Sequence, residues 1–155
     1  MVDLADLISA DAVVHRLKAN QKNQALFELA EIAVKAYGVD LALTYESTLE
    51  RERLGGTGVG DGVAIPHARI KGLAAPMAVI AVVDPAIDFD APDGRAADII
   101  VLLLSPDDAG ADHLKALARI SRLLRRQEIR DGIRAARSAG AIHALTCVSG
   151  ASVAA

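Results

Sequence analysis

Four histidines are the side chains of this sequence best suited to nucleophilic or acid–base chemistry, and their surroundings differ. His67 follows Pro66, whose ring fixes the backbone and removes a hydrogen-bond donor, so we expect this imidazole at the edge of a sheet. Glycines that let backbone N–H groups approach an anion precede it, in a loop with Thr57, Gly58, Gly60 and Gly62. The pattern indicates an anion site beside a histidine. The alternative is a surface histidine that follows a turn.

His113 is the second candidate, because it opens a predicted helix that starts near Asp112. The positive end of a helix dipole disfavours a charged imidazole but favours a bound dianion, to which His113 could donate a hydrogen bond. The alternative is an ordinary polar residue in a first turn. His15 and His143 have no glycine loop or arginine pattern beside them and receive no role. We expect no metal, since His67 and His113 lack a third ligand at a known spacing.

Two helices are predicted before the glycine loop. Apolar residues at helical spacing predict the first between Asn20 and Gly38, with Asn20 or Asn23 as its N-cap. The second opens at Asp40 and stops at the glycine pair 55–56. Its last turn carries Arg51, near the carbonyl end where cations are favoured. Residues 4–18 have no clean period and are expected to form a short lead-in element.

The middle and the end of the chain complete the predicted fold. A flexible loop feeds a short strand at 63–65, and apolar runs at 78–83 and 98–104 predict two more strands. The last run is apolar throughout, so we expect it at the centre of the sheet. A helix over 112–126 is expected to bury a face made of Leu114, Leu117, Ala118, Ser121 and Leu124. Shorter helices at 128–137 and 138–145 complete an α/β fold of three layers, a mixed sheet between helices.

Length and composition fit one compact domain, which we place at residues 1–147, followed by a flexible tail at 148–155. The formal net charge of -3 provides no basic field for nucleic acid. The single cysteine, Cys147, indicates a reducing compartment, so we expect the cytoplasm. The acidic start does not suit a secretory signal, and no apolar run is long enough to span a bilayer.

A family resemblance covers nearly the whole chain, from about residue 4 to residue 145. The string 49–69, Leu-Glu-Arg-Glu-Arg-Leu-Gly-Gly-Thr-Gly-Val-Gly-Asp-Gly-Val-Ala-Ile-Pro-His-Ala-Arg, resembles the signature of enzyme IIA domains of the mannitol, fructose and nitrogen-regulatory class in the bacterial phosphotransferase system. The stretches 87–94 and 113–121 resemble the same family in the same order. The glycine run that ends in Ile-Pro-His is the specific part.

The resemblance implies a role for each candidate residue. His67 would accept a phosphoryl group from a histidine phosphocarrier protein, with His113 as the second active-site histidine and Arg51 as the active-site arginine. A guanidinium stays charged and suits a transferring phosphoryl group, and the family needs no cofactor or metal. The family often has serine where this chain has Gly56, so a hydroxyl contact is lost there unless Thr57 replaces it.

The segments 66–69 and 117–124 resemble most the nitrogen-regulatory branch, which reports its phosphorylation state to potassium-handling and nitrogen-metabolism proteins. Two alternatives remain open. A sugar-specific enzyme IIA for fructose or mannitol would pass the group to a IIB domain. A binding module that is never phosphorylated would leave His67 without a chemical role.

Overall fold

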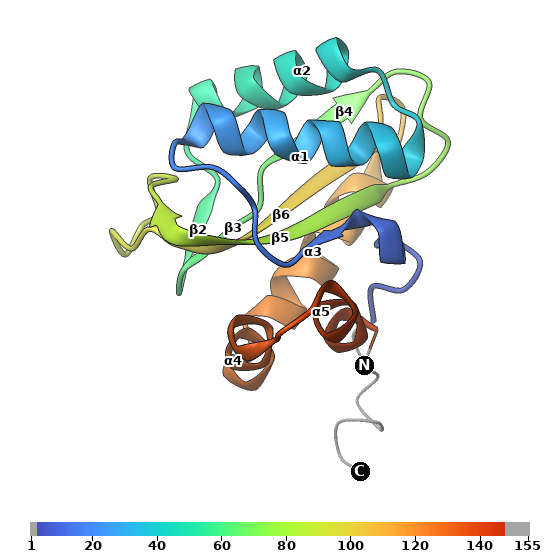
Figure 1. Ribbon diagram of the computed structural model, residues 1–155. Coiled ribbons are helices and arrows are strands. Elements are labelled where there is room, and N and C mark those ends of the chain that lie inside the picture. Colours follow the sequence, from blue (N-terminus) through green and yellow to red (C-terminus); the bar gives the residue numbers. More distant parts are fainter. Residues whose placement is uncertain (1–2, 148–155) are drawn as a thin grey trace.

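The computed structural model describes residues 3–147 as a mixed sheet between two layers of helices. Figure 1 shows helices α1 and α2 on one face of the sheet and helices α3, α4 and α5 on the other. The six strands follow the order β1-β5-β6-β3-β2, and β4 pairs with β6 beyond β3. This arrangement confirms the predicted three-layer α/β fold. The predicted tail at 148–155 lies outside the described residues.

The strands are short except for two long central ones. They span Val13–Val14 (β1), Gly58–Gly60 (β2), Val63–Ala64 (β3), His67–Ile70 (β4), Met77–Ile87 (β5) and Ala97–Pro106 (β6). Strand β6 has neighbours on both sides, with β5 antiparallel to it and β3 and β4 parallel to it. The predicted central position of this strand is therefore confirmed. Residues 58–60 of the glycine run form edge strand β2, where a flexible loop was expected, and residues 10–14 form a 3-10 turn followed by β1.

Helices α1 (Lys22–Tyr37) and α2 (Leu41–Leu54) occupy the predicted segments. Gly38 ends α1 in the left-handed region at φ 72°, and the Asp40 side chain caps α2 by accepting a hydrogen bond from the Leu43 amide. The predicted asparagine cap of α1 is wrong. Its N-cap is Gln21, which makes no side-chain capping bond.

Helix α3 (Ala111–Leu124) is present, but the predicted buried face is wrong for most of its members, Leu124 excepted. Leu114 is 64% exposed, whereas the side chains that face the sheet are His113, Ala116, Ile120, Leu123 and Leu124. Two apolar stripes run along this helix, and the narrow one with Ala116 packs closely on β6. Of the predicted leucines, Leu114 faces outward, Leu117 is half-buried and Leu124 is buried. Helices α4 (Gln127–Ala135) and α5 (Ala139–Thr146) follow as predicted.

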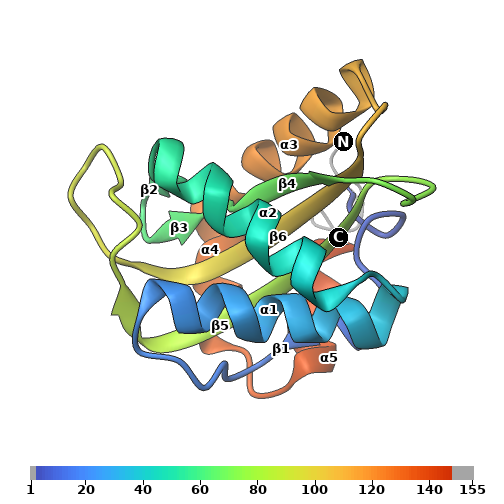
Figure 2. The ribbon, with the colours of Figure 1, turned by 90° about the horizontal axis from the view of Figure 1, so that it is seen from above.

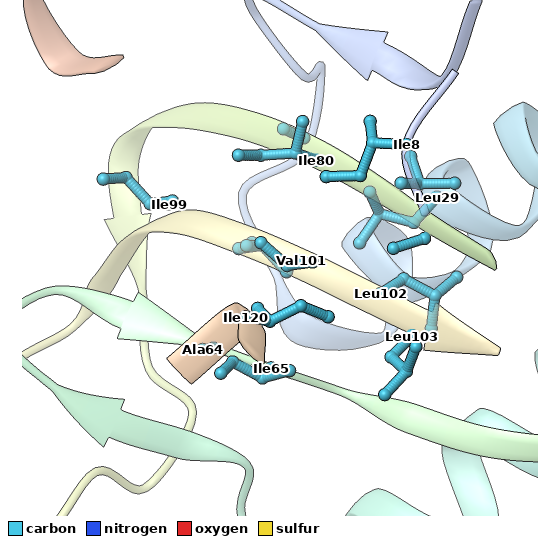
Figure 3. Close-up of a cluster of buried hydrophobic side chains, with 14 of the residues drawn as sticks. Ile8, Leu29, Ala64, Ile65, Ile80, Ile99, Val101, Leu102, Leu103 and Ile120 are labelled. Carbon is cyan, nitrogen blue, oxygen red and sulfur yellow. The ribbon is translucent and has the colours of Figure 1, made fainter. Parts of the chain in front are cut away.

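The hydrophobic core lies on both faces of the two long strands. Figure 3 shows Ile80 of β5 and Leu102 of β6 among side chains that come from both helical layers, including Leu29 and Ile120. Each of these four side chains is completely buried. Burying such side chains stabilises the fold by about 1.5–3 kcal/mol each. Over the described part of the chain, no helix has the length and apolar character needed to cross a membrane.

Candidate active site

Three of the predicted site residues, Arg51, His67 and His113, meet at the open edge of the sheet, where β4 lies between α2 and α3. Figure 2 shows this edge from above, with α2 crossing in front of the sheet and α3 beside β4. A hollow of about 530 Å³ opens there, lined by Ser47, Glu50, Arg51, Leu54, His67, Ala68, Arg69, His113, Leu114 and Leu117. Three elements distant in the sequence thus supply the arginine and both candidate histidines.

His67 opens β4, and its ring is held by a local hydrogen bond. Its Nδ1 lies 2.8 Å from the carbonyl oxygen of Ile65. A carbonyl oxygen only accepts, so Nδ1 carries the proton and donates it, which leaves a lone pair on Nε2 of the neutral ring. Burial lowers the pKa of His67, the Ile65 hydrogen bond opposes this shift, and the positive charge of Arg51 lowers the pKa further. The neutral form with a nucleophilic Nε2 is therefore favoured.

His113 lies in the first turn of α3, and its ring centroid is 5.4 Å from that of His67. Its side chain is buried, and its Nδ1 is 2.7 Å from the hydroxyl oxygen of Ser105 on β6. Burial lowers the pKa of His113, and the charges of His67 and Arg69 lower it further. Two neutral imidazoles therefore stand side by side at this edge.

Arg51 on α2 and Arg69 on β4 both line the hollow and supply positive charge to it. Arg51 sits in the last turn of α2, where its Nη1 donates to the carbonyl oxygen of Gly55 at 2.9 Å. That bond uses one of its five N–H donors and leaves others for an anion. Arg69 follows His67 by two residues on β4, so both side chains leave the same face of the strand. The electrostatics of the hollow favour a negatively charged group.

Thr57 reaches a smaller hollow of about 250 Å³ that also touches His67, with Gly58 beside it. Its backbone amide donates to Glu52 Oε2 at 2.9 Å, and its hydroxyl donates to Glu52 Oε1. Glu52 is buried and also pairs with Lys22 at 3.3 Å. The Thr57 hydroxyl therefore already has a hydrogen-bond partner, and the buried carboxylate of Glu52 holds the loop in place through its two bonds to Thr57. Sequence reasoning missed Glu52, although it directly follows Arg51.

The glycines of the loop owe their type to packing on a neighbouring segment. A Cβ on Gly56 would lie 2.4 Å from the carbonyl oxygen of Phe89, and one on Gly58 would lie 2.8 Å from the Cβ of Ala91. The amide of Gly58 donates to the Phe89 carbonyl at 3.0 Å, so it is not free for an anion. A serine in place of Gly56 has no room for its Cβ unless this backbone moves.

Gly60 and Gly62 lie away from both hollows that touch His67. A Cβ on Gly60 would meet the Asp93 carboxylate, and one on Gly62 would lie 2.4 Å from Arg134 Nη2. Both glycines adopt positive φ, at 103° and 77°, in the turn that joins β2 to β3. The structure brings Arg51, His67, His113, Thr57 and Gly58 together, but it does not bring Gly60 and Gly62 to this site.

The two remaining histidines contact backbone carbonyls elsewhere in the fold. His15 Nε2 donates to the Ala136 carbonyl at 2.8 Å, and His143 Nε2 donates to the Ile8 carbonyl at 2.9 Å. Each bond links segments far apart in the sequence. Within residues 3–147, no group of three or more histidine, cysteine, aspartate or glutamate side chains is arranged to hold a metal ion.

Comparison with known proteins identifies the class to which this fold and site belong. Residues 6–146 match the family described as the EIIA 2 component of the phosphoenolpyruvate-dependent sugar phosphotransferase system. This match spans nearly the whole described chain. The chain belongs to this family, and it is therefore a component of the phosphotransferase system.

Individual relatives show which members of the family this chain resembles. A nitrogen regulatory protein of Bradyrhizobium diazoefficiens is 46% identical over 151 residues, which cover 97% of this chain and 99% of that protein. A fructose-specific EIIA component of Haloferax volcanii is 36% identical over 118 residues, covering 76% of this chain and 77% of that protein. The crystal structure of the nitrogen regulatory protein IIA-Ntr from Neisseria meningitidis has a TM-score of 0.84 at 28% identity, covering 91% of this chain and 97% of that one.

Proposed function

We propose that the chain is a phosphocarrier that accepts a phosphoryl group on Nε2 of His67 from the phosphohistidine of a histidine phosphocarrier protein. One observation carries this proposal. His67 holds its only proton on Nδ1 against the Ile65 carbonyl, so Nε2 is a bare nucleophile in a hollow that Arg51 makes positive. The lowered pKa of His67 keeps that nitrogen unprotonated at neutral pH.

The transfer balances without a proton acceptor. Nε2 of His67 attacks phosphorus in line, a P–N bond forms there, and the P–N bond to the donor histidine breaks, so that its electron pair returns to the donor ring. Charge on the phosphoryl oxygens is stabilised by the guanidinium of Arg51 and by an N–H of His113. No proton has to leave Nε2, because it holds none. The charged and titratable residues described around the hollow are two histidines, two arginines and Glu50.

Exposed leucines around the hollow support docking of another protein. Leu54 at the end of α2 is 82% exposed and Leu114 on α3 is 64% exposed, and both line the hollow that contains His67. Apolar side chains around a reactive group favour a transient protein partner, because their burial drives association. We infer that the phosphocarrier docks over these two leucines and places its histidine at His67.

The nitrogen-regulatory role is the preferred branch within this proposal. The 46% identity to a nitrogen regulatory protein extends over almost the full length of both chains. By this inference, the phosphorylation state of His67 signals nitrogen, potassium or carbon status to regulatory target proteins. The fructose-specific relative supports the second candidate, a sugar-specific enzyme IIA that passes its group to a IIB domain.

The decisive experiment is incubation with enzyme I, the histidine phosphocarrier and phosphoenolpyruvate, followed by intact-mass and acid-lability analysis. We expect one acid-labile phosphoryl group on the wild type and none on His67→Ala. His15→Ala is the matched histidine control and should be labelled like the wild type. Adding a fructose or mannitol IIB domain then separates the branches, since only the sugar-specific protein should lose its label to IIB. An unlabelled wild type would instead support the binding module.

A further inference from the structure

Ser105 is the penultimate residue of the buried strand β6, next to His113, which lines the active-site hollow. Its side chain is completely buried, and its register partner on β4 is Arg69, two residues after His67. Within the described chain, its hydroxyl has one hydrogen-bond partner, Nδ1 of His113 at 2.7 Å. Because this hydroxyl is buried, water does not offer it another hydrogen-bond partner.

The direction of this hydrogen bond follows from the cost of burying a polar hydrogen. If His113 donated from Nδ1, the Ser105 hydroxyl hydrogen would need a second acceptor, and among residues 3–147 this hydroxyl makes no other hydrogen bond. An unsatisfied buried donor is unfavourable. The hydroxyl therefore donates to Nδ1 of His113, and the proton of the neutral His113 ring resides on Nε2.

His67 is held in the opposite form. Its Nδ1 donates to the Ile65 carbonyl, so its Nε2 carries the lone pair. The centroids of the two rings are 5.4 Å apart. In each ring Nδ1 is hydrogen-bonded and Nε2 is not, but Nε2 of His67 carries a lone pair whereas Nε2 of His113 carries a proton. A nucleophile and a donor are the complementary pair that phosphoryl transfer to His67 needs.

We propose that Ser105 is a positioning residue that holds His113 as the Nε2–H tautomer, so that His113 donates to the phosphoryl oxygens while His67 attacks. This assignment rests on the proposed function for its catalytic meaning, although the tautomer itself does not. Ser105 touches no reacting atom and acts through His113. The resemblance of the chain to enzyme IIA domains gives Ser105 no role.

Two-bond proton–nitrogen correlation spectra of histidine-labelled protein test the tautomer without any transfer reaction. At mildly alkaline pH we expect the proton of wild-type His113 on Nε2, with the signals assigned through their loss in His113→Gln. Ser105→Ala removes one oxygen from a buried site and should convert His113 to a mixture of both tautomers. Thr48→Ala is the matched control, because Thr48 is also buried and donates one 2.7 Å hydrogen bond, to the Thr44 carbonyl. This control should leave the His113 spectrum unchanged.

The kinetics of phosphoryl transfer test whether the His113 tautomer affects the rate at which His67 accepts the group. Ser105→Ala should accept the phosphoryl group about two- to tenfold more slowly, the effect of one hydrogen bond, and Ser105→Cys, which keeps a weak donor, should recover part of the rate. A wild-type His113 protonated on Nδ1, or a Ser105→Ala protein with wild-type tautomer and rate, would overturn the assignment. If the wild type shows the expected tautomer but accepts no phosphoryl group, the proposed function fails while the Ser105–His113 hydrogen bond stands.

Discussion

Replacing Glu52 by glutamine should destabilise the protein, because the Glu52 carboxylate holds the loop that carries Thr57. The Glu52 side chain is 3% exposed, accepts both the amide and the hydroxyl of Thr57, and pairs with Lys22 at 3.3 Å. A glutamine can keep its oxygen at the place of Oε2, where the Thr57 amide and Lys22 both donate, and turn its N–H₂ toward the Thr57 hydroxyl, which then accepts, but it carries no negative charge. The hydrogen bonds lose their charge assistance, and Lys22 loses a buried counter-ion.

The magnitude follows from these contacts. Breaking a buried ion pair costs about 3–5 kcal/mol, and hydrogen bonds to charged groups are worth about 1.5–3 kcal/mol each. Lys22 is 25% exposed and keeps Asp90 at 3.2 Å, so the lower end applies. We expect Glu52→Gln to lower the free energy of unfolding by about 3 kcal/mol, which lowers Tm by about 6–12 °C for a chain of this size.

Urea unfolding followed by circular dichroism measures this change, with thermal unfolding as the second readout. Glu46→Gln is the matched control, because Glu46 lies on the same helix α2 but is exposed, and it should stay within about 0.5 kcal/mol of the wild type. A Glu52→Gln protein as stable as this control would refute the reasoning, since the carboxylate would then not hold the loop.

Three further predictions concern the site. Arg51→Ala should slow phosphoryl transfer by about 10²–10³-fold in a rapid-quench assay, because a charged donor to the phosphoryl oxygens is lost, whereas the exposed Arg53→Ala should transfer normally. Because the pKa of His67 lies below its ordinary value, transfer should persist as pH falls through that value and decline only below it, when Nε2 becomes protonated; a rate that declines at the ordinary histidine pKa would contradict this. Gly58→Ala should lower stability by about 1–3 kcal/mol in urea, since the new Cβ meets Ala91, and an unchanged midpoint would disprove that close contact.

Features fixed by local chemistry could be predicted from the sequence. Gly38 ends α1 and Asp40 caps α2, because positive φ and a side-chain acceptor are properties of single residues. The apolar run that forms β6 has no polar side to expose to water, so its position at the centre of the sheet could be predicted. The joining of His67 and His113 was expected from resemblance, and the structure supplies the reason: β4 and β6 are neighbours and α3 follows β6.

Features that depend on which segment packs on which could not be predicted. Helix α3 has two apolar stripes of equal period, and only contact with the sheet decides that Ala116 turns inward while Leu114 turns outward. The density of glycines was interpreted as an anion cradle, yet Gly58 is small because the segment of Phe89 lies against it. Such close approaches join residues about thirty positions apart, and nothing in the local pattern reveals them.

His67 stands on a strand rather than on a loop, with residues 67–70 paired in register to residues 103–106. A group held in this way needs no ordering before it reacts, so a visiting carrier meets a surface that is already complete. With His67 as acceptor, the forward and reverse transfers pass through the same arrangement, and neither direction requires a change of fold. If the proposed function holds, the fraction of His67 that is phosphorylated follows the ratio of phosphorylated to unphosphorylated carrier, and the protein reports that ratio.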